Sequence, residues 1–449
     1  MISINIHDEK NHIAAVPLPD LSAIHRVGAD HEKIEPSEIA VGVVIGRASE
    51  YFDFFVFAIA SVLVFPSVFF PFEQRLEGTL YAFAVFSLAF IARPFGTVLS
   101  MEIQRRFGRE VKLTAALFLL GISTAGIAFL PSYAQLGSTS IVLLALLRIG
   151  QGMALGGSWD GLPSLLALNA PAERRGWYAM LGQLGAPLGF FVAAGLFWYL
   201  LSTLASSDFL DWGWRYPFYA AFAINVVALF ARLRLIATGD YARLLEEREL
   251  QPVPIGDLLS SQKRNLLIGA LAALASYALF HVVTVFPLSW MSLYSNRSMS
   301  AFLLLQMFGA VLAAAGMVAS GLIADRVGRR TTLAVLACLI AVFSAFVPQL
   351  MNGGELGQNI FVLAGFSLLG LSYGQAAGAV TANLPAKYRY TGAALTSDLA
   401  WLVGAGFAPL VALYLSAHFG LVYVGIYLFS GAACSLAALS LNRALDQHD

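Results

Sequence analysis

The sequence predicts an all-α membrane protein with twelve transmembrane helices in two six-helix halves. Hydrophobic residues make up 58% of the 449-residue chain and charged residues only 12%, against about a quarter in soluble domains. Two basic turns, Arg105-Arg106-Phe107-Gly108-Arg109 and Asp325-Arg326-Val327-Gly328-Arg329, lie nearly half the chain length apart. A turn duplicated at this interval indicates two related halves, which in membrane proteins usually enclose a pathway.

The apolar residues fall in runs long enough to cross the hydrocarbon core, which takes about 20 residues of helix. Because water is absent there, the backbone must satisfy its own hydrogen bonds, and no alternating pattern favours a barrel. The twelve predicted spans are residues 40–66, 78–102, 112–131, 140–166, 176–203, 215–236, 265–291, 300–323, 332–350, 358–381, 390–416 and 420–441.

Positive charge is concentrated on one side of these spans. Eighteen Lys and Arg residues follow the even-numbered spans or flank the central connector, whereas the other loops hold only Arg75 and Arg297. The positive-inside rule therefore predicts that the even-numbered span ends and both termini are cytoplasmic, in the cell inner membrane. The eighteen are Arg105, Arg106, Arg109, Lys112, Arg174, Arg175, Arg232, Arg234, Arg243, Arg248, Lys263, Arg264, Arg326, Arg329, Arg330, Lys387, Arg389 and Arg443.

Changes of composition divide the chain into five parts. Residues 1–38 are polar and acidic without the layout of a cleaved signal peptide, which predicts a disordered cytosolic tail whose histidines lack metal-ligand spacing. The halves are residues 39–236 and 265–442, joined by a charged cytosolic connector, 237–264, and followed by a second tail, 443–449. Cys338 and Cys434 lie inside apolar spans, where we expect helix packing and no disulfide.

Short motifs spread from residue 40 to about 440 resemble the major facilitator superfamily, and within it the metabolite:proton symporter family. The matching stretches are Gly46-Arg-Ala-Ser-Glu50-Tyr-Phe-Asp53-Phe, Ala92-Arg93-Pro94-Phe-Gly96, Arg148-Ile-Gly-Gln151-Gly152 with Gly156-Gly157, Gln183-Leu-Gly185-Ala-Pro187-Leu-Gly189, and Arg389-Tyr-Thr-Gly392. The resemblance implies proton-coupled transport of citrate, other di- and tricarboxylates, shikimate, or zwitterions such as proline and betaine.

The chain departs from that family at several positions, which makes it a divergent member. Similar proteins have Gly-Asp in the first basic turn where this chain has Gln104-Arg105, and Glu in the fourth span where it has Ser158. A Thr-like position in the first span is Arg47, and an Asn in the eleventh span is Asp398. A Pro-Glu pair before the eleventh span is Thr381-Ala382.

Two acids in the first span are candidates for binding a proton. Glu50 and Asp53 share a helix face, with Arg47 one turn earlier. Two close carboxylates in a low dielectric do not both ionise at low cost, so one is expected to hold a proton near neutral pH. The alternative is a static ion pair of Arg47 with Glu50 that positions the first helix.

A second set of polar residues inside the spans is predicted to bind substrate. Arg148 lies near mid-membrane, stays charged, and can hold a carboxylate bidentately, either Asp53 or a substrate group. The resemblance implies pairing with the first span; the alternative is a packing arginine bonded to backbone carbonyls. The substrate-binding candidates are Arg148, Gln151, Arg47, Tyr51, His281, Gln375, Asp398 and Trp401, with Gln306 a weaker one. For His281 simple packing is the favoured alternative, and Arg93 is interpreted as structural.

The basic turns and the neighbouring acids are predicted to form a gate. Its candidate residues are Arg105, Arg109, Asp160, Asp325, Arg326 and Arg329. Asp160 is expected near the cytosolic end, within reach of the first turn. The family resemblance places an acid at position 105 against the amino end of the eleventh helix. Arg105 is therefore expected to meet that end beside Lys387 and Arg389 and repel it, unless Glu102, Glu110 or Asp160 neutralises it.

The fifth span contains a predicted bend at Gly185, Pro187 and Gly189. Small residues let this helix approach a neighbour closely, and Pro187 removes one helical hydrogen bond. A bending fifth helix would serve a rocking motion of the halves, and tight packing is the other interpretation.

These features predict a secondary transporter and no enzyme, cofactor, metal site or nucleic-acid partner. No phosphate loop or metal-spaced His/Cys set is present in the sequence, so a gradient must drive transport. We expect a proton symporter that imports a small organic acid or zwitterion through the lipid bilayer as a monomer. The alternatives are a proton-coupled exporter and a non-transporting sensor with the same fold.

Overall fold

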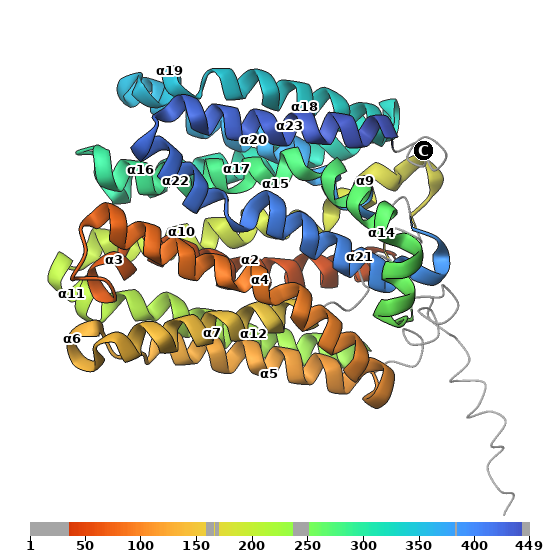
Figure 1. The fold of residues 1–449 in the computed structure, drawn as a ribbon, viewed down its shortest axis with the longest axis horizontal. Coiled ribbons are helices and arrows are strands. Elements are labelled where there is room, and N and C mark those ends of the chain that lie inside the picture. Colours follow the sequence, from red (N-terminus) through yellow and green to blue (C-terminus); the bar gives the residue numbers. More distant parts are fainter. Residues whose placement is uncertain (1–35, 159–165, 167–169, 237–250, 382–383, 442–449) are drawn as a thin grey trace, which may run out of the picture. The chain divides into compact units, whose positions relative to one another are not determined.

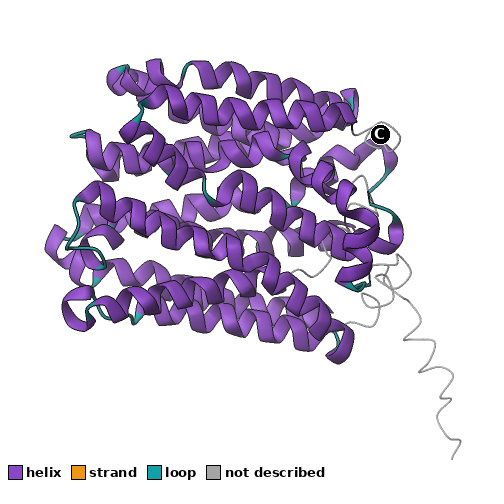
Figure 2. Cartoon of the chain, in the orientation of Figure 1, coloured by secondary structure: helices purple, strands orange, loops and turns teal. Residues whose placement is uncertain are grey.

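The computed structural model describes residues 36–158, 166, 170–236, 251–381 and 384–441. Within these ranges the regular structure is helical and contains no strand (Figure 2). Helices occupy all twelve predicted spans, and the long helices run roughly alongside one another (Figure 1).

The helices before the connector are α2 (Pro36–Leu63), α3 (Phe65–Val68), α4 (Arg75–Phe107), α5 (Arg109–Ala128), α6 (Tyr133–Leu136), α7 (Ser138–Gly157), η1 (Ala172–Arg174), α9 (Arg175–Leu181), α10 (Gly185–Thr203), α11 (Ser206–Asp211), η2 (Gly213–Arg215) and α12 (Tyr216–Ile236). Those after it are α14 (Ile255–Ala272), α15 (Leu274–Thr284), α16 (Phe286–Tyr294), α17 (Met299–Val327), α18 (Arg329–Ala345), α19 (Val347–Asn352), α20 (Gly354–Thr381), α21 (Ala386–Ala400), the π-helical turn η3 (Trp401–Gly406), α22 (Ala408–His418) and α23 (Leu421–Leu441). Helix α14 thus begins well before the predicted seventh span, inside the segment interpreted as the connector.

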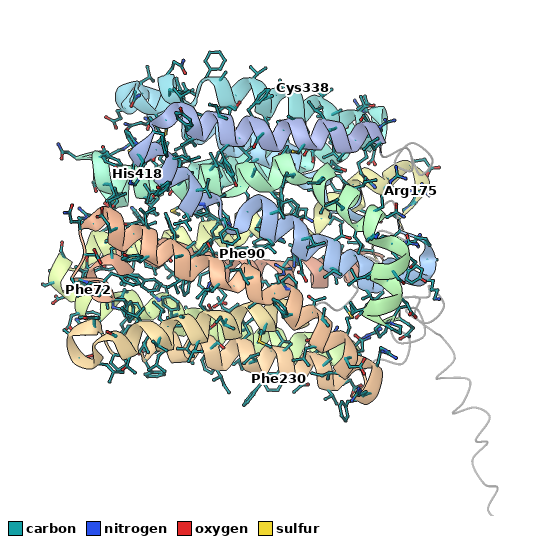
Figure 3. The ribbon with its side chains drawn as sticks, viewed as in Figure 1. Phe72, Phe90, Arg175, Phe230, Cys338 and His418 are labelled. Atoms are coloured by element: carbon teal, nitrogen blue, oxygen red, sulfur yellow. The ribbon has the colours of Figure 1, made fainter. Side chains whose placement is uncertain are left out.

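Many large apolar side chains point outward, as expected of a protein surrounded by lipid. Phe118, Phe129 and Phe230 are 64%, 71% and 68% exposed. Figure 3 shows Phe230 and Cys338 on the outside of the helices, and both cysteines are exposed and unpaired. Among the described residues, nine helical segments are long and apolar enough to cross a membrane. Together these features describe a multi-pass membrane protein.

Four prolines interrupt the long helices at related places in the two halves. Pro66 and Pro287 follow the breaks that start α3 and α16. Pro187 and Pro409 lie in the first turns of α10 and α22. A proline lacks the N–H that would bond back one turn, so each helix breaks just before it. The interval within each pair nearly equals that between the two basic turns, as duplication predicts.

Glycines at four-residue spacing bring two helix pairs into close contact. A Cβ added at Gly152 or Gly156 of α7 would collide with the α4 backbone at Ala89 or Arg93. A Cβ added at Gly185 or Gly189 of α10 would lie 2.6 Å from the α2 backbone. The predicted close approach of the fifth helix is therefore to α2. The break in this helix falls at residues 182–184, directly before Gly185.

The two basic turns lie at one end of the helices, called here the turn end. Gly108 (φ 91°) and Gly328 (φ 84°) reverse the chain there, in a conformation that disfavours a side chain. The ends of α9 and α21 near these turns, and the start of α14, lie on the same side (Figure 1). The opposite end, with α3, α6, α11 and α16, is called the far end.

Candidate functional site

A buried acid, Asp53 of α2, occupies the centre of a polar cluster inside the first half. It is 1% exposed, and its carboxylate accepts hydrogen bonds from Thr124 Oγ1 at 2.8 Å and Gln151 Nε2 at 3.3 Å. Gln151 Nε2 also donates to Thr124 Oγ1 at 2.9 Å. The cluster joins α2, α5 and α7, so a change in the charge of Asp53 would alter hydrogen bonds among all three helices.

Arg148 completes this cluster from α7. Its Nη1 donates to Gln151 Oε1 at 3.0 Å and its Nε to the Phe86 carbonyl at 3.2 Å. The guanidinium lies over the rings of Phe57, Phe86 and Phe54, at 4.0, 4.9 and 5.7 Å from their centres. Nη2 has no hydrogen-bond partner among the described residues. Arg148 therefore reaches Asp53 through Gln151, and it is bonded to a backbone carbonyl as well.

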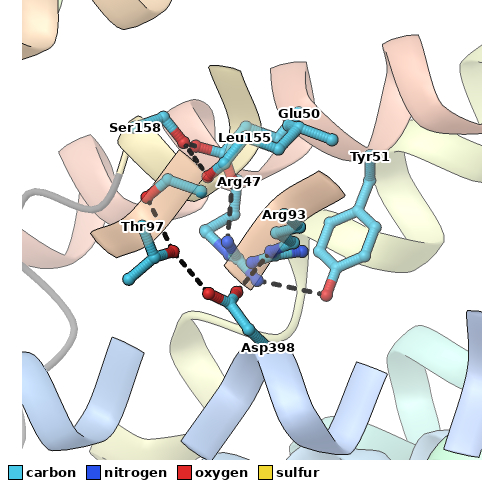
Figure 4. A network of polar contacts seen from close by, with 9 residues as sticks. Arg47, Glu50, Tyr51, Arg93, Thr97, Leu155, Ser158 and Asp398 are labelled. Atoms are coloured by element: carbon cyan, nitrogen blue, oxygen red, sulfur yellow. Dashed lines mark hydrogen bonds and ion pairs between the residues drawn. The ribbon is translucent and has the colours of Figure 1, made fainter. Parts of the chain in front are cut away.

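The two acids of α2 have separate partners. Glu50 Oε2 accepts from Arg47 Nη1 at 2.7 Å, and Glu50 Oε1 accepts from Ser158 Oγ at 3.2 Å (Figure 4). Asp53 bonds only neutral side chains among those described. The structure thus contains the Arg47–Glu50 ion pair considered as an alternative, and the expectation that one of these two acids holds a proton near neutral pH stays a prediction.

A hollow of about 410 Å³, partly open to solvent, lies beside the Arg47–Glu50 pair. It is lined by Arg47, Glu50, Tyr51, Phe54, Ala89, Phe90, Arg93, Leu155 and Trp401. Arg47 Nη2 also donates to Tyr51 Oη at 3.3 Å, and Tyr51 Oη shares a short hydrogen bond with Tyr373 Oη of α20. The hollow therefore has two arginines, aromatic walls, and lining residues from before and after the connector.

Arg93 forms an ion pair across the molecule. Its Nε donates to Asp398 Oδ1 of α21 at 2.6 Å, and Thr97 Oγ1 makes a short hydrogen bond to the other carboxylate oxygen (Figure 4). Arg93, interpreted as structural from the sequence, thus has a partner, Asp398, that the sequence did not indicate. This pairing explains why α21 tolerates an acid inside a membrane span.

The remaining candidates of the second half do not line the hollow. His281 of α15 is fully buried against Phe54, Phe86 and Phe280, with ring centres 5.2, 5.4 and 5.1 Å away. This is the packing position favoured for it. Gln306 donates to the Thr284 carbonyl at 2.8 Å. Gln375 lies near the turn end, where it donates to the Gly176 carbonyl at 3.2 Å.

At the turn end Asp325 of α17 binds the first turn of α9. Its Oδ1 accepts from the backbone N–H of Gly176 at 2.6 Å, and both carboxylate oxygens lie 3.3 Å from the backbone nitrogen of Trp177. Arg329 donates to the Arg175 carbonyl at 3.2 Å, while Arg326 is exposed. These contacts join a turn of the second half to a helix of the first.

The first basic turn differs from expectation. Arg105 donates to Glu102 of its own helix at 2.8 Å, and Glu102 also accepts from Arg106 at 2.6 Å, so this carboxylate offsets part of the charge that was expected to repel α21. Contact with α21 is made instead through Tyr390, which donates to Gln104 at 3.0 Å and accepts from Lys112 at 3.3 Å. The Arg109 guanidinium lies 5.9 Å from the centre of the Tyr390 ring. Asp160 lies outside the described residues.

Comparison with known proteins identifies the family. The sequence model of the Major Facilitator Superfamily matches residues 132–409. The chain is 36% identical over 413 residues to the inner membrane metabolite transport protein YhjE of Escherichia coli (strain K12), covering 91% of this chain and 94% of that protein. The chain belongs to the Major Facilitator Superfamily. It is therefore a membrane transporter, and the resemblance noted from its motifs is confirmed.

Other superfamily members extend the comparison. The shikimate transporter of Escherichia coli (strain K12) is 28% identical over 409 residues, covering 89% of this chain and 92% of that protein. The solved structure of a D-xylose-proton symporter superposes with a TM-score of 0.66 at 18% identity, covering 90% of this chain and 97% of that one. The predicted twelve-helix fold is confirmed by this likeness.

Proposed function

We propose that this transporter carries a small organic acid or zwitterion across the inner membrane together with protons, by alternating access. The observation that carries the proposal is the setting of Asp53. It is a buried carboxylate that accepts hydrogen bonds from Thr124 and Gln151, and Gln151 in turn accepts one from Arg148. An acid in such a place can bind and release a proton without breaking a direct ion pair, and intramembrane acids commonly serve this purpose.

The hollow is the proposed substrate site. It combines a few charged and polar groups with aromatic walls, which is the usual composition of a small-molecule site. Arg47 and Arg93 suit a carboxylate, and Tyr51, Phe90 and Trp401 offer apolar surface to a ring or a methylated amine. The similarity to a shikimate transporter favours the same class of ligand. Arg148 does not line the hollow, so we assign it to the proton site together with Gln151.

Alternating access would come from rocking of residues 39–236 against residues 265–442, with 237–264 as the connector. The Asp325 and Tyr390 contacts would close the turn end, and the break before Gly185 would let α10 bend. We place the turn end and both termini in the cytoplasm, because both basic turns lie at that end and the positive-inside rule assigns the ends of the even-numbered spans to the cytoplasm. Arg215, just before α12, adds a third basic residue to the far end and leaves this assignment unchanged.

The transporter is proposed to work as a monomer surrounded by lipid. Both the Asp53 cluster and the hollow are built within one chain, and no residue of either needs a second copy.

Transport by the purified protein in liposomes tests this function. A thermal-shift screen of carboxylates and betaines selects the compound to label. We expect exchange of that compound across the liposome membrane, and faster uptake when an inward proton gradient is imposed. An exporter would instead show efflux driven by protons entering from outside, and a sensor would bind a compound without exchanging it. Binding without exchange would therefore overturn the proposal.

A further inference from the structure

The ion pair of Arg93 with Asp398, called here the inter-half clamp, joins α4 to α21. Its members are 305 residues apart in sequence, and their side chains are 13% and 3% exposed. It lies between the hollow and the Tyr390 contacts of the turn end, because Gln104 is about three helical turns beyond Arg93 on α4. Breaking the clamp therefore removes the ion pair between α4 and α21 at the level of the hollow, where Thr97 of α4 also bonds Asp398.

The hollow contains two arginines, and each is bound to an acid of the protein. Arg47 is held by Glu50 of the same helix, so a change of partner there moves no helix. Arg93 is held by Asp398 of a different helix from the other half. Of these two pairs, the second can convert ligand binding into a separation of the halves.

Arg93 still has donors to offer a ligand. Asp398 uses its Nε, and the two Nη groups donate to no residue that the structure describes. A guanidinium presents its five N–H groups in a planar fork that matches a carboxylate. A carboxylate entering the hollow can thus bind the Nη groups before Asp398 leaves.

We propose that a substrate carboxylate replaces Asp398 on Arg93 and so unlocks the turn end. This inference rests on the proposed function, in that the ligand carries a carboxylate and occupies the hollow. Without ligand, separating the clamp leaves two buried charges without partners, which opposes opening. With the carboxylate bound, Arg93 keeps an anionic partner, so separation leaves only Asp398, which moves with α21, without an ionic partner.

The substitution Asp398→Asn isolates the charge of the clamp. A neutral amide cannot form an ion pair with Arg93, so the attraction between α4 and α21 at this level is lost. The amide keeps the size of the side chain and an oxygen that can accept from Thr97. A change of behaviour in this variant therefore reports the loss of the ion pair.

A cysteine at position 101 reports the separation of α4 from α21. Met101 is 1% exposed and lies one turn from both Thr97 and Gln104, which bond α21. The native cysteines are first replaced by Cys338→Ser and Cys434→Ser. In Met101→Cys protein in lipid nanodiscs, we expect Asp398→Asn to speed alkylation by N-ethylmaleimide by about tenfold, within the roughly 5–150-fold range of coupled sites. Glu355→Gln, which breaks the ion pair with Arg297 away from the turn end, should leave the rate unchanged.

The same reporter tests displacement by a carboxylate. Sodium shikimate is the first probe and its uncharged methyl ester the comparator, with citrate and glycine betaine used if shikimate does not stabilise the protein. We expect the stabilising carboxylate to speed labelling of the protein that retains Asp398 and to bind about tenfold more tightly to Asp398→Asn. Arg93→Gln should abolish this binding, and its combination with Asp398→Asn should label no faster than Asp398→Asn alone.

Two results would overturn the inference. Equal labelling rates with and without the Asp398→Asn substitution, in proteins of matched melting temperature, would show that the clamp does not hold the turn end. Failure of every carboxylate to stabilise the protein or to speed labelling would refute the exchange. If both labelling effects are found but a proton gradient does not drive uptake, the result counts against the proposed coupling at Asp53 and not against this inference.

Discussion

At the scale of single residues, two arginines inside the spans have different surroundings. Arg148 is enclosed by three phenylalanine rings and bonded to Gln151, whereas Arg93 borders the hollow and bonds Asp398. A planar guanidinium suits both places, because it stacks on rings and donates in several directions at once. This difference supports the proposal that the first arginine sets the charge around Asp53 and that the second binds a ligand.

Arg148→Lys is expected to reduce transport by about tenfold or more, although it keeps the charge. An ammonium cannot reach both Gln151 and the Phe86 carbonyl while stacking on Phe57, and hydrogen bonds to charged groups contribute about 1.5–3 kcal/mol each. Counterflow in liposomes at pH 7 measures the effect. Arg215→Lys is the matched control, because Arg215 also stacks on a ring and bonds carbonyls but lies at the far end. Near-normal counterflow in Arg148→Lys would show that Arg148 is only a packing residue.

Asp53 and Arg148 can be identified from the sequence as candidate functional residues, because a charged side chain inside a membrane span has a high free-energy cost and usually serves a function. No such signal marks Thr124 or Thr97, since a hydroxyl in a helix can bond the carbonyl one turn back at little cost. Sequence alone also cannot pair Arg93 with Asp398, because a contact across 305 residues depends on how the halves pack. For Arg105 the structure shows the alternative partner, Glu102, one helical turn away, which also pairs with Arg106.

At the scale of helices, close glycine contacts place the functional side chains. Gly152 and Gly156 let α7 lie directly on α4, and Gly185 and Gly189 let α10 lie directly on α2. These contacts fix the backbone at Arg93 and at Arg47, the two arginines of the hollow. The glycine spacing is visible in the sequence, and the helices that it brings together are not.

Gly156→Ala is expected to destabilise the protein by about 1–3 kcal/mol, the usual cost of overpacking. The added methyl would collide with the Arg93 carbonyl and with Thr97, so the helices must move apart. Gly256→Ala provides the control, because a Cβ there meets nothing within 4 Å and alanine favours the helix. Melting temperatures of the two variants in the same detergent make the comparison. Equal melting temperatures would show that α4 and α7 can adjust without strain.

At the scale of the whole molecule, contacts at and near the turn end join segments from before and after the connector. Asp325 binds the start of α9, Tyr390 binds Gln104 and Lys112, and Arg93 binds Asp398. The duplicated basic turns predicted where such contacts would lie. The first turn contributes them through Gln104 and Lys112, because Arg105 is already paired.

Asp325→Asn is expected to open the turn end, because the carboxylate that accepts from the N–H groups of Gly176 and Trp177 becomes a weaker, neutral acceptor. The reporter is a cysteine in place of Ala324, which is 6% exposed and faces Gly176. Because the weakened contact between position 325 and α9 is worth roughly 1 kcal/mol, this cysteine should be alkylated several-fold faster in Asp325→Asn. Arg105→Asp serves as the control, since Arg105 bonds only Glu102 among the described residues, and should change the rate little. A faster rate in Arg105→Asp than in Asp325→Asn would restore the first turn as the main latch.

The most direct test of proton coupling is transport by Asp53→Asn in liposomes, measured both as exchange and as uptake driven by an inward proton gradient. The amide keeps the size of the carboxylic acid and imitates its protonated form, and it can still accept from Thr124. The account predicts that exchange continues, while the proton gradient no longer accelerates uptake. Uptake in Asp53→Asn that still rises with the imposed proton gradient would contradict it and remove Asp53 from the coupling mechanism.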